Sequence, residues 1–140
     1  MQSISPVLTV RDMDASVTFY REVLGFVDAD VLRAPDGKPV HGEARRGSVT
    51  IQFSPAEPSG PDANDRRGAG VILYIQVGDE DIDRYWESVV NAGADVIEEI
   101  KTQFWGDRCF SIADPDGYHL MFAKQVREVS MEELQAHAGA

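Results

Sequence analysis

The fold is decided by WGDRCF at residues 105–110 together with DPDGYHLMF at residues 114–122. Pro115 fixes φ at the first central position of a turn, and Gly117 accepts a conformation that other residues resist. The stretch therefore predicts a strand, a tight turn and a second strand. Outward from this hairpin, the chain has the pattern of a diverged tandem repeat.

A strand followed by an amphipathic helix is predicted in each half of the chain. In the first half, residues 7–10 form the strand, Asp12 can cap the helix and Gly25 ends it. In the second half, residues 71–77 form the strand and Gly93 ends the helix. Both helices carry an apolar stripe that is expected to be core rather than a cofactor site. The stripes are Val17, Tyr20, Val23 and Leu24, and then Ile82, Tyr85, Trp86, Val89 and Val90.

Three further strands are predicted after each helix, at about 27–33, 40–46 and 48–54, and at about 95–101, 107–113 and 118–124. The chain is therefore expected to be α+β, with two tandem βαβββ modules at residues 4–54 and 71–124. Residues 55–70 are rich in Pro, Gly, Ser, Asp and Asn, which indicates a surface linker within one domain spanning 1–140. A Ser-x-x-Glu capping box predicts a short C-terminal helix at about 130–137.

The composition indicates a folded protein and excludes several classes of partner. The chain has 140 residues, 43% hydrophobic residues and a formal net charge of −11. This acidity argues against nucleic acid, whose phosphates need Lys and Arg, and against anionic membranes, but it permits a cationic ligand. No apolar run reaches the roughly 18 residues of a membrane span, and the N-terminus lacks the features of a signal peptide. The single cysteine, Cys109, excludes a disulfide framework, and we expect a cytoplasmic location.

Strand parity predicts which side chains share the open face of each sheet, because successive side chains on a strand point to opposite faces. Ile51, Phe53, Leu120 and Phe122 are expected to pack under the helices. The opposite faces, which remain open, carry Ser5, Thr9, His41, Glu43, Arg45, Thr50, Gln52, Tyr74, Gln76, His119 and Met121, with Trp105 at the mouth of a hairpin. Such a mixed polar and aromatic lining suits a small organic molecule.

The chain resembles the vicinal-oxygen-chelate superfamily, which includes glyoxalase I, bleomycin-resistance proteins and extradiol dioxygenases. SPVLTVRD at 5–12, FY at 19–20 and LGF at 24–26 are similar to the opening of bleomycin-resistance-type members. QFWGDR at 103–108, the Asp-Pro-Asp-Gly turn and VSMEEL at 129–134 are similar to the PhnB-like, glyoxalase-related branch. The resemblance implies that the two sheets curl into a cup lined by their open faces, and that the protein is a homodimer.

The resemblance also gives the positions at which metal-dependent members hold their ligands. Here these positions are occupied by Ser5, Gln52, Ile72 and Met121. Only Gln52 is a plausible ligand, because Ile72 has no donor atom and a thioether suits a hard divalent ion poorly. We therefore expect neither a metal ion nor a cofactor.

A displaced metal site remains an alternative. His41, Glu43 and His119 together offer two imidazoles and one carboxylate, a set that is known to bind iron. His41 and Glu43 belong to one module and His119 to the other, so their convergence is open. Without a metal, His41 or Glu43 could serve as a general base.

The leading hypothesis is a metal-free small-molecule-binding protein that sequesters a drug or metabolite, with a ligand that is cationic or planar and aromatic. Trp105 is either a surface on which a ligand ring stacks or a hydrophobic plug. Arg108 either orients an acidic group of the ligand or pairs with Asp107 or Asp114. The rival hypothesis is an enzyme, either a glyoxalase-like lyase or isomerase or a dioxygenase, and a third is a regulatory or assembly module. The expected ligand-binding residues, with no catalytic residue among them, are His41, Glu43, Gln52, Tyr74, Trp105, Arg108, His119 and Met121.

Overall fold

The computed structural model describes residues 1–56 and 68–139. The chain forms two compact units, each described by itself below. Unit 1 comprises Met1–Val71 and Asp114–Tyr118, and unit 2 comprises Ile72–Ala113 and His119–Ala140. Most of the predicted linker at 55–70 lies outside the described residues. The assignment of the whole chain to a single domain stays a prediction.

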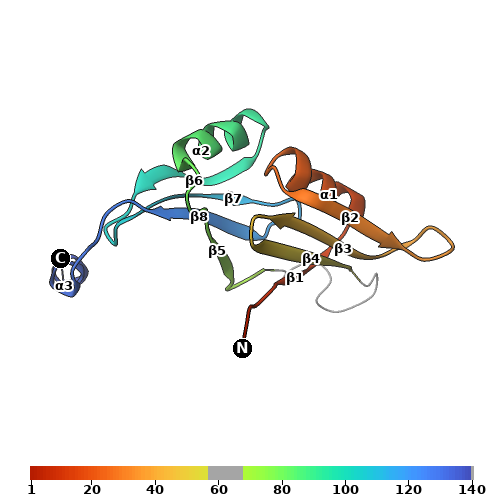
Figure 1. Cartoon of the computed structure of the whole chain (residues 1–140), viewed down its shortest axis with the longest axis horizontal. Coiled ribbons are helices and arrows are strands. Elements are labelled where there is room, and N and C mark those ends of the chain that lie inside the picture. The colour runs from red at the N-terminus through yellow and green to blue at the C-terminus, as the bar shows by residue number, and fades with distance from the viewer. Residues whose placement is uncertain (57–67, 140) are drawn as a thin grey trace. The chain divides into compact units, whose positions relative to one another are not determined.

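The helices and strands follow the predicted order, a βαβββ module twice (Figure 1). The first module contains β1 (Val7–Val10), α1 (Met13–Glu22), β2 (Val27–Arg33), β3 (Pro39–Arg46) and β4 (Val49–Pro55). The second contains β5 (Ile72–Gln76), α2 (Ile82–Asn91), β6 (Asp95–Thr102), β7 (Asp107–Ala113) and β8 (His119–Gln125), and α3 (Met131–Ala138) follows. The α+β class and the two tandem modules are therefore confirmed.

The sheet of unit 1 has strand order β1-β4-β3-β2 and is open at both edges. β1 runs parallel to β4, and the other neighbours are antiparallel. The Asp12 side chain caps α1 by accepting the N–H of Ala15 at 3.0 Å, as predicted. Buried Tyr20 of α1 contacts Phe26 and Phe53, with ring centroids 5.5 and 5.0 Å apart. The apolar stripe of α1 is therefore core.

The predicted tight turn between β7 and β8 belongs to unit 1. Gly117 has a φ of +86°, which is why glycine occupies this position. One carboxylate oxygen of Asp114 accepts the backbone N–H groups of Asp116 and Tyr118, both at 2.9 Å. The other oxygen accepts the hydroxyl of buried Tyr20 at 2.9 Å. Burial raises the pKa of Asp114, and it raises the pKa of Tyr20 well above its usual value.

Further contacts join this turn to the rest of unit 1. Buried Asp116 accepts the backbone N–H of Arg11 at 3.0 Å and the hydroxyl of Ser16 at 3.4 Å. The Tyr118 hydroxyl donates to the backbone carbonyl of Thr9 at 2.8 Å. Both aspartates of the turn are therefore structural residues of unit 1.

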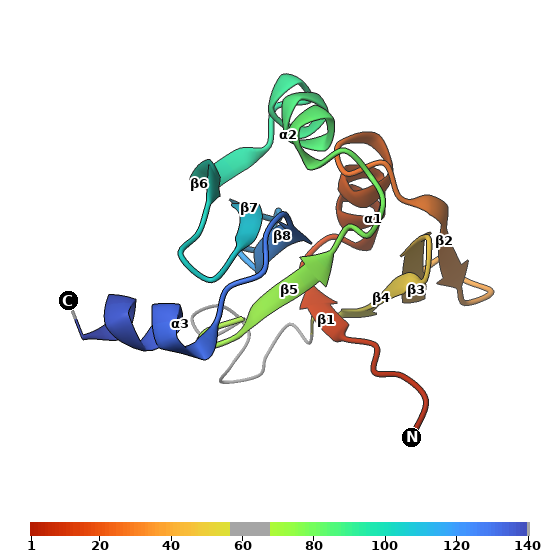
Figure 2. The same cartoon turned by 60° about the vertical axis from the view of Figure 1, so that its left-hand side comes forward.

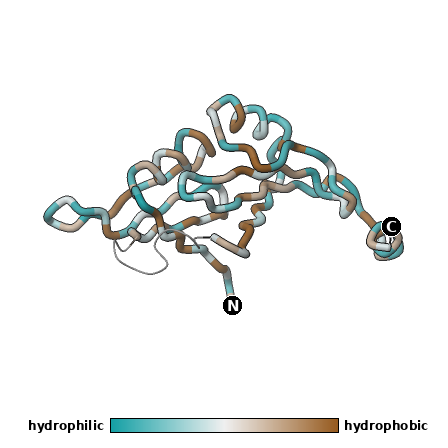
Figure 3. Tube along the Cα trace, turned by 180° about the vertical axis from the view of Figure 1, so that it is seen from behind, coloured by the Kyte–Doolittle hydropathy of each residue, from teal (hydrophilic) through white to brown (hydrophobic). Residues whose placement is uncertain are grey.

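The sheet of unit 2 has strand order β5-β8-β7-β6 and is also open. The Asp81 side chain caps α2. Tyr85 of α2 contacts Phe110 and Phe122, with ring centroids 6.0 and 5.2 Å apart, so Phe122 packs under the helix as predicted. In Figure 3, hydrophobic segments recur along the strands and alternate with polar or neutral ones.

Helix α3 lies beyond the end of β8 and has no buried residue (Figure 2). The Ser130 hydroxyl caps it by accepting the N–H of Glu133 at 3.1 Å, which confirms the predicted capping box. The ring of His137 stacks on Phe104, with centroids 3.9 Å apart. In the described part of the chain, every helix is too short or too polar to cross a membrane.

Candidate functional site

One face of the unit 2 sheet gathers several of the predicted ligand residues. The strand register pairs Tyr74 of β5 with Met121 of β8, and Met121 with Ser111 of β7. Because side chains alternate along a strand, His119 shares the face of Met121, and Asp107 shares the face of Ser111. Helix α2 contacts the opposite face. We call these five residues the Tyr74 face.

Two hydrogen bonds link a loop tryptophan to a carboxylate on the Tyr74 face. Trp105 Nε1 donates to the Tyr74 hydroxyl at 3.1 Å, and that hydroxyl donates to Asp107 Oδ2 at 2.5 Å. Tyr74 nevertheless stays 41% exposed, and Trp105 is half-buried. An accessible aromatic ring beside a carboxylate is an arrangement that suits a planar cation.

The environment of Tyr74 predicts a measurable pH dependence. Desolvation, followed by the hydrogen bond to Asp107, raises the pKa of Tyr74 to about 12. The folded protein therefore retains this proton at a pH where the unfolded chain, in which the tyrosine pKa has its ordinary value of 10.0, releases it. This contribution to stability is complete below about pH 10 and is lost as the pH rises towards about 12.

We expect Tyr74→Phe to leave the tyrosinate absorbance of the folded protein unchanged at about pH 11, because Tyr74 is still protonated there. Spectrophotometric titration of both proteins measures this. In Asp107→Asn, the pKa of Tyr74 should move down towards its usual value. A wild-type absorbance that exceeds that of Tyr74→Phe by one full tyrosinate at about pH 11 would contradict the raised pKa.

Two polar atoms on the Tyr74 face are buried and have no hydrogen-bond partner among the described residues. They are Ser111 Oγ and His119 Nε2, which lie on the neighbouring strands β7 and β8. A buried polar atom without a partner costs about 1–3 kcal/mol of stability. A ligand that supplied hydrogen-bonding groups at this point would remove that cost.

Glu98 of β6 borders the Tyr74 face, because its register partner is Ser111. Gln103 Nε2 donates to Glu98 Oε1 at 3.0 Å, and Lys101 Nζ lies 3.0 Å from the same oxygen. These two hydrogen bonds lower the pKa of Glu98. Glu98 is therefore a second carboxylate near the Tyr74 face.

Cys109 lies on the same face of β7 as Ser111 but is fully buried, and burial raises the pKa of its thiol. The thiol is therefore poorly suited to act as a nucleophile.

Arg108 lies on the helix-covered face of β7 and is bound by α2. Its Nε donates to both carboxylate oxygens of Asp83, at 3.0 and 3.1 Å, and Nη2 donates to Asp83 Oδ1 at 2.7 Å. These bonds hold the pKa of Asp83 below its usual value. Pairing with Asp107 or Asp114, one of the two alternatives considered for Arg108, is not what the structure shows, since its partner is Asp83. Arg108 therefore does not belong to the Tyr74 face.

The other three predicted ligand residues lie together on one face of the unit 1 sheet. Glu43 of β3 is the register partner of Gln52 of β4, and His41 lies two residues before Glu43 on the same face. All three are half-buried, and Glu43 forms an ion pair with Arg45. The register confirms that Glu43 and Gln52 lie side by side, and a role of these three residues in ligand binding stays a prediction.

The residues at the positions of the superfamily's metal ligands do not fit a divalent metal ion. Ile72 of β5 has a hydrocarbon side chain that is 53% exposed, and Met121 of β8 offers only a thioether. Ser5 and Gln52 are neutral oxygen donors and weak ligands without a charged partner. Within residues 1–56 and 68–139, no three His, Cys, Asp or Glu side chains converge in a way that could hold a metal ion.

Asp107, Ser111 and Glu98 were not among the predicted site residues. The alternation that placed His119 and Met121 on one face applies equally to β7. It would have placed Asp107 and Ser111 on a common face had it been extended to this strand. The position of Glu98 follows only from the register between β6 and β7, which is irregular at this residue.

Comparison with known proteins identifies the family. The model of the Glyoxalase/Bleomycin resistance protein/Dioxygenase superfamily matches residues 3–122. The chain therefore belongs to this superfamily. The uncharacterized protein Mb0911c of Mycobacterium bovis is 32% identical over 137 residues, which cover 96% of this chain and 90% of that protein.

The solved structures that are similar to this chain include the following two. The glyoxalase-related enzyme from Clostridium phytofermentans is 26% identical, with a TM-score of 0.68, and the match covers 90% of this chain and 96% of the other. TioX from Micromonospora sp. ML1 is 20% identical, with a TM-score of 0.69, over 90% of this chain and 100% of the other. The second likeness concerns the fold alone.

Proposed function

We propose that this protein is a metal-free member of the superfamily that binds and sequesters a planar, cationic organic molecule on the Tyr74 face. The observation that carries the proposal is the Trp105–Tyr74–Asp107 chain of hydrogen bonds, which sets an exposed aromatic ring beside a carboxylate. The unpartnered atoms of Ser111 and His119 on the same face offer further hydrogen bonds to a ligand.

The charge of the whole chain supports the same ligand class. A formal net charge of −11 raises the local concentration of cations at the surface. In this proposal the protein belongs to the PhnB-like branch and acts in the cytoplasm as a homodimer. Sequestration of a toxic cation by this protein would give antibiotic resistance. The buried, unpaired thiol of Cys109 is compatible with a reducing compartment.

Titration with proflavine, a planar cation, tests the proposal by fluorescence or calorimetry. Asp107→Asn should raise the Kd about tenfold, because it removes one charge-assisted interaction. Asp79→Asn is the matched control, since it makes the same charge change at an exposed residue of a loop in unit 2, and it should stay within about twofold of wild type. Equal loss in both variants, or no binding by the wild type, would contradict the proposal.

Ser111→Ala gives a second test of ligand binding at the Tyr74 face. Removal of an unpartnered buried hydroxyl should stabilise the free protein by about 1 kcal/mol and weaken a ligand that bonds to it. Urea unfolding and proflavine titration measure the two effects. Stabilisation without any change in affinity would remove Ser111 from the ligand site.

The rival function is an enzyme, either a glyoxalase-like lyase or isomerase or a dioxygenase. It is favoured by one similar structure at 26% identity, which is described as a glyoxalase-related enzyme. Elemental analysis of protein purified without a chelator separates the two functions. Stoichiometric Fe, Zn, Ni or Mn that is lost in His41→Ala or His119→Ala would overturn the metal-free proposal.

A further inference from the structure

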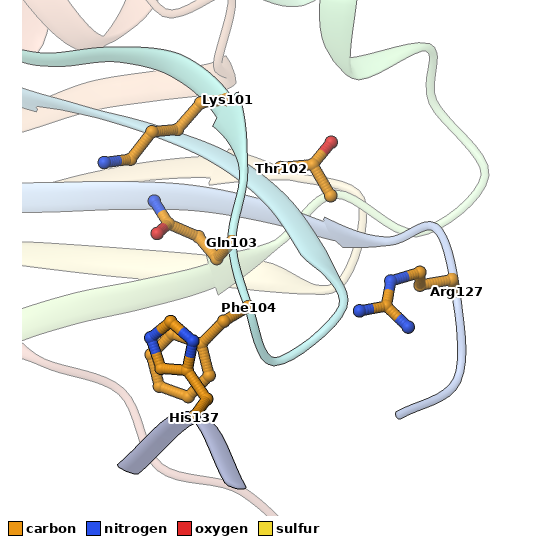
Figure 4. Close-up of a pocket in the computed structure, with 6 residues that line it drawn as sticks. All are labelled: Lys101, Thr102, Gln103, Phe104, Arg127 and His137. Atoms are coloured by element: carbon orange, nitrogen blue, oxygen red, sulfur yellow. The ribbon is translucent and has the colours of Figure 1, made fainter. Parts of the chain in front are cut away.

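A pocket lies between the end of β6 with the loop that follows it, the segment after β8 and helix α3 (Figure 4). Its volume is about 560 Å³, which is within the range of about 300–1,000 Å³ typical of small-molecule sites. We call it the α3 pocket. The residues that line it are Lys101, Thr102, Gln103, Phe104, Arg127 and His137.

The lining of the α3 pocket carries positive charge, although the chain as a whole is strongly acidic. Lys101 and Arg127 contribute two cations, and no carboxylate is among the lining residues. Among the described residues, Lys101 pairs with Glu98 at 3.0 Å and Arg127 pairs with Glu133 at 3.2 Å. Both pairs are well exposed to solvent and therefore hold their cations weakly.

Arg127 retains hydrogen-bonding capacity for a ligand. Its ion pair uses Nη1, and its other guanidinium N–H groups have no partner among the described residues. A guanidinium presents its donors in a planar fork that matches a carboxylate. The free donors of Arg127 therefore favour a carboxylate over a neutral polar group.

The same pocket has an aromatic wall. Figure 4 shows the rings of Phe104 and His137 lying face to face. Their interplanar angle is 11°. Phe104 remains 42% exposed, and its ring also meets Trp105 edge-on at 5.0 Å. A planar group can therefore contact exposed aromatic surface while a charged group on the same molecule reaches Arg127.

We propose that the α3 pocket is a second binding site, for a planar organic anion of the aromatic carboxylate class. The carboxylate binds Arg127, and the planar group lies against Phe104. The ligand has the opposite charge to the one proposed for the Tyr74 face, so the two sites do not compete for one ligand. This inference does not depend on the function proposed above.

Calorimetric titration of the full chain with 2-naphthoate tests the site. Arg127→Gln should raise the Kd about tenfold, because a charge-assisted hydrogen bond is lost. Arg33→Gln is the matched control, since Arg33 also forms an exposed ion pair, with Asp14, and lies in unit 1. It should leave the Kd within about twofold of wild type, which shows that the effect is not one of net charge.

Two further comparisons separate the parts of the site. Phe104→Leu should weaken 2-naphthoate about fivefold and leave cyclohexanecarboxylate, an anion without a planar ring, unchanged. Asp107→Asn should leave 2-naphthoate binding unchanged, so failure at the Tyr74 face and failure at the α3 pocket are distinguishable. No binding of 2-naphthoate at millimolar concentration, equal binding of uncharged 2-naphthamide, or equal loss in Arg127→Gln and Arg33→Gln would overturn the proposal.

Discussion

Replacing Asp114 by alanine is expected to lower the free energy of unfolding by about 3 kcal/mol. The carboxylate accepts three hydrogen bonds, from the backbone of Asp116 and Tyr118 and from the hydroxyl of Tyr20. Tyr20 is fully buried, so its hydroxyl would lose its hydrogen-bond partner on Asp114 without gaining water. Urea unfolding followed by circular dichroism measures the loss.

Asp114→Asn is the matched control for this substitution. The amide oxygen can still accept both backbone N–H groups, and the amide nitrogen can donate to the Tyr20 oxygen. We therefore expect this variant to stay within about 1 kcal/mol of wild type at neutral pH. If alanine and asparagine were equally destabilising, the hydrogen bonds would not explain the loss.

The raised pKa of Asp114 also predicts how the free energy of unfolding depends on pH. Burial raises the pKa of Asp114 above its ordinary value of 3.8, so the folded state binds the proton more readily than the unfolded state. The contribution of this group is most favourable below about pH 4 and declines as the pH rises through the folded pKa. Relative to Asp114→Asn, the wild type should therefore lose stability between acidic and neutral pH. An opposite slope would contradict the raised pKa.

Replacing Gly106 by alanine is expected to destabilise the protein by about 3 kcal/mol and to displace Trp105. Gly106 has a φ of +98°, and a Cβ there would lie 2.3 Å from the backbone oxygen of Arg127. The carbonyl of Gly106 also accepts the N–H groups of Val126 and Arg127, at 3.0 and 3.2 Å. The backbone itself would have to move, because the obstructing atom does not belong to a flexible side chain.

Gly37→Ala is a control that separates the cost of the steric clash at residue 106 from the cost of placing a non-glycine residue at a positive φ. Gly37 has a φ of +88°, and a Cβ there would meet no atom within 4 Å. This control should cost only about 1 kcal/mol. Fluorescence of Gly106→Ala in a Trp86→Phe background, where Trp105 is the only tryptophan, should shift to the red as the indole leaves Tyr74. An unchanged spectrum would show that the loop tolerates the methyl group.

Local sequence patterns were sufficient to predict the fold. The caps at Asp12 and Ser130 and the glycine at 117 depend on near neighbours, and the structure confirms them. Strand parity succeeded for the same reason, since alternation is a property of a single strand. The partners of Asp114 and Asp116 could not be predicted, because Tyr20 and Arg11 are distant in sequence and only tertiary packing brings them close.

Prediction of the candidate site was less complete. Arg108 does not pair with Asp107, its nearest carboxylate in sequence, because Asp107 points to the opposite face of β7. Its actual partner, Asp83, is placed by the packing of α2 on the sheet. The α3 pocket was not predicted, since it depends on the position of a helix whose residues are all exposed or half-buried. Packing between elements, and not the pattern within them, decides these contacts.

The turn between β7 and β8 also bears on the order in which the protein is made. Asp114–Tyr118 belongs to unit 1, whereas all other described residues of that unit precede residue 72. During synthesis, the first half of the chain leaves the ribosome before the acceptor for the Tyr20 hydroxyl exists. Unit 1 is therefore completed only after translation has passed residue 118, and a fragment that ends at residue 71 lacks part of its own core.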